Sequence, residues 1–238
     1  RDTIYRNIDT RSISSIGPVT RFKEKNAFSI CEPLIQALKD GSAQNVEISR
    51  PSYLQCHRYF HKYREHFQQL FSPDAKSLNT IKQKYPEIFN KDCVRVSMHL
   101  RLKWGVKYKA EYFKDALRHI LSTEKQGRDV NLYVFSDDIP HARQILKTIP
   151  GVNNTYCVGN ADYIDLWMMS LCDHNITCHS TLGWWGAYLN TNPSKKVTHP
   201  SDITTFFGGV LGMKDVDKLR RNHIPEGRIS IKSSSLTK

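Results

Sequence analysis

The chain has 238 residues, of which 39% are hydrophobic and 11% aromatic, so it can bury a sizeable core. Its charged fraction of 24% is ordinary, which argues against wholesale disorder. A formal net charge of +12 favours phosphorylated or polyanionic ligands without choosing between them. No run of about 18 apolar residues occurs, so we expect no membrane span within the sequence.

The first 91 residues give a weak pattern of elements and are expected to form an N-terminal lobe. Residues 30–38 predict a short helix, and residues 41–45 a loop. Aromatic residues recur at about helical spacing between residues 52 and 71, which predicts one amphipathic helix. Residues 74–89 predict a further helix.

After residue 92 the pattern becomes regular. Strands are expected at 93–100, 131–135, 155–158, 175–178 and 195–198, and helices at 110–122, 140–149, 162–172 and 182–189. Such alternation with short connections predicts an α/β domain over residues 92–210, with a parallel sheet and helices on both faces. Residues 211–238 are basic, and their composition predicts a peripheral tail.

Ligands of parallel sheets bind beyond the carboxyl ends of the strands. His99 to Arg101, Ser136 to Asp138, Gly159 to Asp162 and His179 to Thr181 follow the predicted strands. We therefore take these segments as the candidate binding edge.

The ionisable residues at the first two strand ends, 99–101 and 136–138, each allow two interpretations. Arg101 could fork onto a phosphate or carboxylate, or pair with a nearby Asp at the surface. His99 could donate to a ligand or bond a backbone carbonyl. Asp137 could accept hydrogens from a ribose or a guanine edge, while Asp138 or Ser136 caps the helix that follows.

The stretch from 174 to 189 joins a short strand to a helix. Ser180 and Thr181 lie at the joint, where they could cap the helix or hold a phosphate at its N-terminus. Asp162 and Asp165 are expected to cap their helix, with paired catalytic carboxylates as the alternative. At least one of the adjacent tryptophans, 184 and 185, is expected to be a core residue.

Several motifs are absent from the sequence. The P-loop, GxGxxG, GxSxG and HExxH patterns do not occur, which weakens kinase, NTPase, dehydrogenase, hydrolase and zincin hypotheses. The six cysteines contain no CxxC pair, so a zinc site is poorly supported.

Four segments resemble the family 11 glycosyltransferases, the α-1,2-fucosyltransferase family. They are the aromatic segment 53–60, the Phe-Ser-Asp-Asp strand end at 135–138, the Asp-to-Ile block at 165–176, and the Ser-Thr-x-x-Trp-Trp segment within 179–189. The family's His-x-Arg-Arg-x-Asp motif is altered. His99 and Arg101 match it, but Leu102 replaces the second Arg and Trp104 replaces the Asp, so no catalytic base is assigned.

The resemblance implies a GT-B fold of two Rossmann-like lobes, with residues 1–91 on the acceptor side. It implies transfer of L-fucose from GDP-fucose to a glycan hydroxyl with inversion, in an α-1,2 linkage, with no metal and no other cofactor. Arg101 would stabilise the β-phosphate, and Ser180 and Thr181 would hold the pyrophosphate. Asp137 would contact guanine, with Ser136 and His99 near the nucleotide.

The same resemblance implies a Golgi-lumenal enzyme with a membrane anchor that precedes Arg1, or a cytoplasmic one if the source is microbial or viral. Its expected partners are a GDP-sugar and a glycan, without nucleic acid. The alternatives are a transferase that uses another GDP-sugar and a catalytically decayed nucleotide- or glycan-binding module. A further hypothesis, that the protein binds nucleic acid, is supported only by its net charge.

Overall fold

The computed structural model describes residues 17–25, 29–49, 54–103, 108–122, 124, 127–202 and 216–233. Its centre is a six-stranded sheet in the order β5-β4-β3-β6-β7-β8, in which every neighbouring pair is parallel. The strands are β3 (Val94–Leu100), β4 (Val130–Ser136), β5 (Asn153–Cys157), β6 (His174–Ile176), β7 (Val197–Pro200) and β8 (Ile229–Ile231). The predicted parallel α/β sheet is therefore confirmed.

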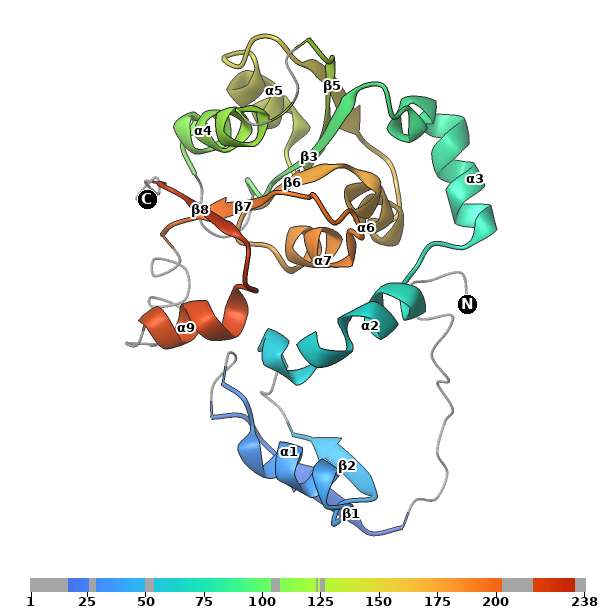
Figure 1. Cartoon of the computed structure of the whole chain (residues 1–238), viewed down its shortest axis with the longest axis vertical. Helices are drawn as coiled ribbons and strands as arrows, with labels where there is room; N and C mark the ends of the chain where they lie inside the picture. Colours follow the sequence, from blue (N-terminus) through green and yellow to red (C-terminus); the bar gives the residue numbers. More distant parts are fainter. Residues whose placement is uncertain are drawn as a thin grey trace.

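Helices cover both faces of this sheet (Figure 1). They are α4 (Ala110–Leu121), α5 (Ile139–Leu146), α6 (Asp162–Leu171) and α7 (Thr181–Leu189). Successive side chains of a strand point to opposite faces. Met98 and Leu100 of β3 accordingly pack with α4 and α5, whereas Tyr133 and Phe135 of β4 pack with α6 on the other face.

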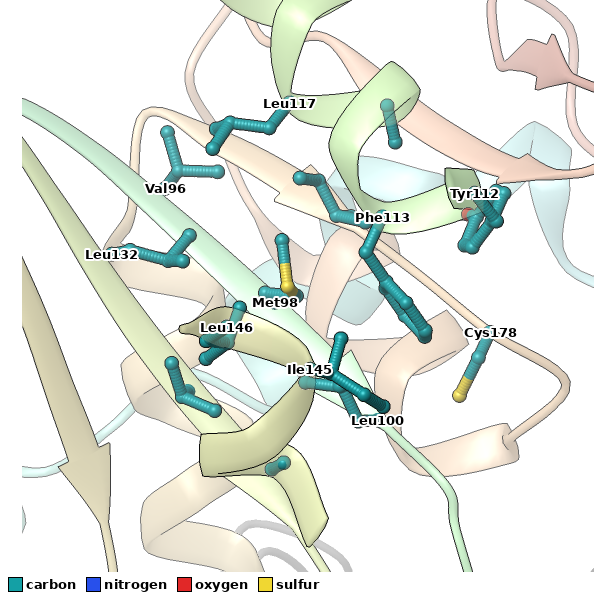
Figure 2. Packing of buried hydrophobic residues seen from close by; sticks show 14 of the residues in the cluster. Val96, Met98, Leu100, Tyr112, Phe113, Leu117, Leu132, Ile145, Leu146 and Cys178 are labelled. Atoms are coloured by element: carbon teal, nitrogen blue, oxygen red, sulfur yellow. The ribbon is translucent and has the colours of Figure 1, made fainter. Parts of the chain in front are cut away.

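The core beneath α4 and α5 accounts for the alternating hydrophobic residues of β3 that predicted this strand. Val96, Met98 and Leu100 are completely buried there, against Phe113 of α4 and Leu146 of α5 (Figure 2). Each such side chain contributes roughly 1.5–3 kcal/mol when it leaves water. The sheet therefore has a rigid centre from which the strand ends project.

The N-terminal part contains a small βαβ unit that lies away from the main sheet in Figure 1. It consists of β1 (Val19–Phe22), α1 (Glu32–Lys39) and β2 (Asn45–Ile48), and the two strands pair in parallel. The sequence predicted α1 but neither strand. Each strand has only four residues, two of them exposed, so neither produces a hydrophobic pattern.

The single helix expected over residues 52–71 is wrong. The described part of this segment forms two 3₁₀ turns, η1 (His57–Tyr59) and η2 (His61–Tyr63), followed by α2 (Arg64–Leu70). Phe60 separates the turns with a non-helical backbone, and its ring stacks on Trp185 at 5.1 Å between centroids. The aromatic residues serve contacts with α7 rather than one continuous helical face.

The second predicted helix, over residues 74–89, also divides. α3 (Ala75–Lys84) has Tyr85 as its C-cap residue, and η3 (Pro86–Phe89) follows. Pro86 has no N–H to donate and disfavours a helical residue before it, so the helix stops there. Both pieces still pack on the face covered by α6.

The C-terminal residues expected as a peripheral tail instead join the domain. After α9 (Val216–His223), β8 becomes the edge strand beside β7, with Thr198 opposite Ile229. β8 has only three residues, and the residues around it are basic and polar. The sequence therefore shows no pattern that would predict this strand. None of the helices in these described segments is long and apolar enough to cross a membrane.

Candidate functional site

The predicted binding residues lie at one edge of the sheet. β4, β3 and β6 are adjacent, and Leu100 of β3 is opposite Ser136 of β4. His99 lies next to the last residue of β3, Arg101 directly follows the strand, and Ser180 follows β6. The parallel topology therefore brings segments about 80 residues apart in sequence to neighbouring positions.

Asp137 fixes the loop that follows β3. Its Oδ1 accepts hydrogen bonds from the backbone N–H groups of Leu102 at 2.7 Å and Lys103 at 3.2 Å. Its Oδ2 lies 3.4 Å from Nε of Arg101. The predicted pairing of Arg101 with a nearby Asp is thus confirmed, and the carboxylate is held by donors of its own chain.

Arg101 keeps most of its guanidinium available. Its side chain is 42% exposed, and within the described residues its Nη groups have no hydrogen-bond partner. A guanidinium held by one nitrogen against Asp137 can still present its outer N–H pair to a phosphate.

His99 is locked in a neutral form beneath the start of α7. Burial lowers its pKa to about 4, and the positive charge of Arg101 adds to this effect. Its Nδ1 lies 3.9 Å from the Cys178 thiol, and the side chain is only 4% exposed. At Gly183 an added Cβ would lie 2.7 Å from the same Nδ1, so only glycine allows this approach.

The N-terminus of α7 lies at the same edge. Ser180 is its N-cap residue, but its side chain makes no capping hydrogen bond. Neither its hydroxyl nor that of the exposed Thr181 bonds to any residue that the structure describes. The free amides and the helix dipole make this terminus suited to an anion.

The remaining predicted residues have structural roles. Asp138 caps α5 by accepting from the His141 N–H at 3.2 Å, as expected, while Ser136 Oγ accepts from the Asp138 N–H at 3.0 Å. The capping expected of Asp162 and Asp165 is wrong, because the N-cap of α6 is Ala161 and no side chain caps it.

Asp165 and the adjacent tryptophans contribute to the structure of the domain: Asp165 by a hydrogen bond, the tryptophans by packing. Asp165 accepts from Asn160 at 2.7 Å, and burial raises its pKa to about 6. Trp184 is 8% exposed and stacks on Tyr188 at 4.9 Å between centroids. The core role expected for at least one tryptophan is confirmed.

Two hollows lie in the described part of the chain. One of about 790 Å³ lies at the ends of β7 and β8, and one of about 320 Å³ lies between α3 and the start of α6. The smaller hollow is lined in part by Gly159, Asn160 and Ala161, which belong to the predicted binding segment after β5. The lining of the larger hollow comes from distant segments and was not predicted. The described residues contain no group of three or more His, Cys, Asp or Glu side chains placed to hold a metal ion.

Comparison with known proteins identifies the family. The profile of glycosyl transferase family 11 matches residues 87–207, which is about half of the chain and includes β3 to β7 with the strand-end residues described above. The chain belongs to glycosyl transferase family 11. The family assignment based on the strand-end motifs is therefore confirmed.

Two curated relatives of this family 11 chain come from Escherichia coli. The O-antigen biosynthesis glycosyltransferase WbnK is 31% identical over 164 residues, covering 63% of this chain and 53% of WbnK. An α-1,2-colitosyltransferase is 26% identical over 204 residues, covering 78% of this chain and 64% of the relative. The chain thus spans between about half and two thirds of the length of these relatives.

Among solved structures, a mutant of Arabidopsis thaliana FUT1 in complex with GDP is similar at a TM-score of 0.48. It is 11% identical, and the match covers 75% of this chain and 50% of that one.

Trp104, which replaces the family's Asp, lies outside the described residues, as do parts of the 1–91 and 211–238 segments.

The contact between Gly183 and His99 can be tested by adding one methyl group. Gly183→Ala is expected to push His99 away, because overpacking displaces buried neighbours, and to weaken the GDP binding expected from the sequence about tenfold. Gly186→Ala is the matched control. Gly186 lies on the same helix as Gly183 but away from the strand ends. Its added Cβ would lie 2.6 Å from Cβ of Met169 in α6.

Both variants are expected to lose about 1–3 kcal/mol of unfolding free energy. Chemical denaturation measures that loss, and calorimetric titration with GDP measures the affinity. A GDP affinity of Gly183→Ala equal to that of wild type would show that His99 has no part in the expected GDP site.

Proposed function

We propose that this chain is the donor-binding part of an inverting transferase that moves L-fucose from GDP-fucose to a glycan hydroxyl, in an α-1,2 linkage. The observation that carries the proposal is the half-exposed Arg101 beside an uncapped helix N-terminus at one sheet edge. Both features bind oxyanions, and their proximity suits a diphosphate. The α-1,2 linkage in the name of the colitosyltransferase relative supports the linkage.

The reaction joins the acceptor oxygen to C1 of fucose as the bond from C1 to the β-phosphate oxygen breaks. GDP leaves with the electron pair of that bond, and the acceptor proton passes to a base that is not assigned. Negative charge therefore grows on the β-phosphate in the transition state. Arg101 and the amides of α7 are placed to stabilise that charge, which is the role a metal ion would otherwise have.

The contacts of Asp137 favour a positioning role. Its carboxylate already accepts from Leu102 and Lys103 and pairs with Arg101. We infer that it orients the phosphate-binding Arg101, and contact with guanine stays a prediction for it. Metal independence and a Golgi location likewise stay predictions.

Ser180→Ala tests the helix terminus separately. The loss of a hydroxyl that caps nothing is expected to leave thermal stability within about 0.5 kcal/mol, because no capping bond is lost. GDP affinity is expected to fall about 10- to 150-fold, as for the loss of one hydrogen bond to a charged group. Unchanged GDP affinity, measured by calorimetry, would remove Ser180 from the site.

The transfer itself is tested by incubating the protein with GDP-fucose and following GDP release and the anomeric signal by NMR. Because the chain spans only part of its relatives, hydrolysis of the donor to free fucose counts as turnover. GDP binding without any turnover, also in the presence of a glycan acceptor, would favour the decayed binding module. Turnover of another GDP-sugar but not of GDP-fucose would move the assignment to that sugar.

A further inference from the structure

The larger hollow is a second polar site on the same side of the sheet. Its volume is about 790 Å³, and it is lined by residues of η1, η2, β7, β8, α9 and the turn after α9. Figure 1 shows α9 beside β8 and facing the start of the η1–α2 segment. The hollow is thus built where the N-terminal and C-terminal segments meet.

Positive charge dominates its lining. Arg58, Arg220 and Arg221 line the hollow, whereas Glu226 is the one acidic residue among the lining residues. Arg58 and Arg221 form no ion pair with any residue of the described segments. Arg220 has a weak one, at 4.0 Å from Asp217. Guanidinium groups that have no ion-pair partner, as those of Arg58 and Arg221 have none among these residues, attract an oxyanion from solution.

Two buried histidines in the lining present hydrogen-bond acceptors. His57 Nδ1 lies 2.9 Å from the Asn222 carbonyl oxygen, and His199 Nδ1 lies 2.9 Å from that of Pro200. Each Nδ1 must donate to its carbonyl, so in the neutral ring Nε2 carries a lone pair. Burial lowers the pKa of both histidines, that of His199 to about 4, which keeps them neutral at pH 7.

The Nε2 atoms are available to a ligand. No residue within the described ranges makes a hydrogen bond to Nε2 of His57 or His199. A neutral imidazole nitrogen accepts from hydroxyl groups but repels an anion's lone pairs. The hollow therefore combines acceptors for hydroxyls with cations for an oxyanion, which matches a polyhydroxylated molecule with one charged group.

The hollow adjoins the proposed donor edge. Trp184 of α7 donates through Nε1 to the His223 carbonyl oxygen of α9 at 2.8 Å. The Tyr108 hydroxyl contacts Nδ1 of His179, directly before Ser180, and donates to the Asp202 carbonyl oxygen beyond β7 at 3.3 Å. The start of α7 and the end of β7 are thus linked by one short chain of contacts.

We propose that this hollow is the acceptor pocket and that it selects a sugar bearing an anionic group, a carboxylate or a phosphate ester. The proposal rests on the proposed transferase function, since only a transferase needs an acceptor next to its donor. The arginines would hold the oxyanion, and Nε2 of His57 and His199 would accept from ring hydroxyls. A donor nucleotide would occupy the β3 and α7 side instead.

The test uses three sugars that differ only at C6: galactose, galacturonic acid and galactose 6-phosphate. Dissociation constants are measured by ligand-observed NMR on wild type, on the double variant Arg58→Gln/Arg221→Gln, and on Arg118→Gln. Arg118 is the control, because its exposed side chain pairs with Asp115 on α4. GDP-induced thermal shifts are recorded for all three proteins, as an independent measure of the donor site.

At least one anionic sugar is expected to bind wild type and Arg118→Gln about tenfold more tightly than galactose. The double variant should reduce that preference below about threefold with the GDP shift unchanged. Whether galacturonic acid or galactose 6-phosphate gains more identifies the carboxylate or the phosphate as the natural group.

Three results would overturn the proposal: no binding of either anionic sugar, equal binding of all three sugars, or a preference that survives in the double variant. A GDP shift lost in the double variant would also overturn it by assigning the hollow to the donor. Absence of a GDP shift in wild type would instead count against the transferase function, while the sugar preference still reports on the pocket.

Discussion

Arg101→Ala is expected to lower kcat for transfer from GDP-fucose by about 100- to 1,000-fold, with a smaller loss of GDP affinity. Charge on the β-phosphate is greatest in the transition state, so a group that binds it there affects turnover more than ground-state binding. Removal of one such stabilising donor typically costs about 3 kcal/mol of transition-state stabilisation. Steady-state kinetics with GDP-fucose measure the effect.

Two variants sharpen this prediction. Arg101→Lys keeps the charge but loses the fork and the Nε contact with Asp137, so it is expected to recover only part of the activity. Lys103→Ala removes an exposed cation from the same loop and should lose less than about threefold. A wild-type kcat in Arg101→Ala, or an equal loss in Lys103→Ala, would contradict the assigned role of Arg101.

Asp173→Ala is expected to lower the free energy of unfolding by about 3 kcal/mol. Asp173 accepts from Nε of Arg95 at 2.9 Å, from Nη2 at 2.6 Å and from its backbone N–H at 2.9 Å. This pair joins the start of β3 to the connection between α6 and β6, and both side chains are at least four-fifths buried. The substitution leaves the Arg95 charge without its partner, which is the costly way to break a buried ion pair.

The pH dependence of that loss has a defined sign. Burial would raise the pKa of Asp173, but the hydrogen bonds from Arg95 outweigh it and hold the pKa below its ordinary value of 3.8. A lowered folded-state pKa stabilises the protein above the unfolded value and loses this effect as pH falls through the folded one. The difference between wild type and Asp173→Ala should therefore be constant from pH 7 to 5 and shrink below about pH 4.

Urea denaturation across this pH range measures the difference. Asp115→Ala is the matched control, because Asp115 forms an exposed pair with Arg118 on α4. Its loss should stay within about 0.5 kcal/mol at every pH. A loss below about 1 kcal/mol for Asp173→Ala would show that the pair contributes little to the stability of the sheet.

The centre of the sheet was predictable because β3, β6 and β7 are largely buried and the neighbouring α4 is amphipathic. Residues 94–100 and 110–121 show their periods directly in the sequence. Residues 229–231 do not, since three residues at a sheet edge are too few to establish a period. The aromatic spacing in 52–71 was misleading, because Phe60 contacts α7 through a break between two 3₁₀ turns.

The candidate site likewise has parts that the sequence predicted and parts that it did not. His99, Arg101, Asp137 and Ser180 were found because strand ends in a parallel sheet converge whatever their spacing in sequence. That Asp137 holds the loop of Arg101 could not be foreseen, since it depends on backbone N–H groups of residues 102 and 103. The histidine-lined hollow was missed because His57 and His199 are 142 positions apart in sequence and come to line one hollow only in the folded chain.

The measurement that tests the central claim most directly is a thermal-shift panel of GDP, GDP-fucose, other GDP-sugars and UDP-sugars on wild type and Arg101→Ala. We expect stabilisation by GDP and GDP-fucose but not by UDP-sugars, and a smaller shift in Arg101→Ala, because a ligand that binds only the folded state raises Tm. Selective stabilisation by UDP over GDP, or shifts that do not depend on Arg101, would contradict a GDP-sugar site at this sheet edge.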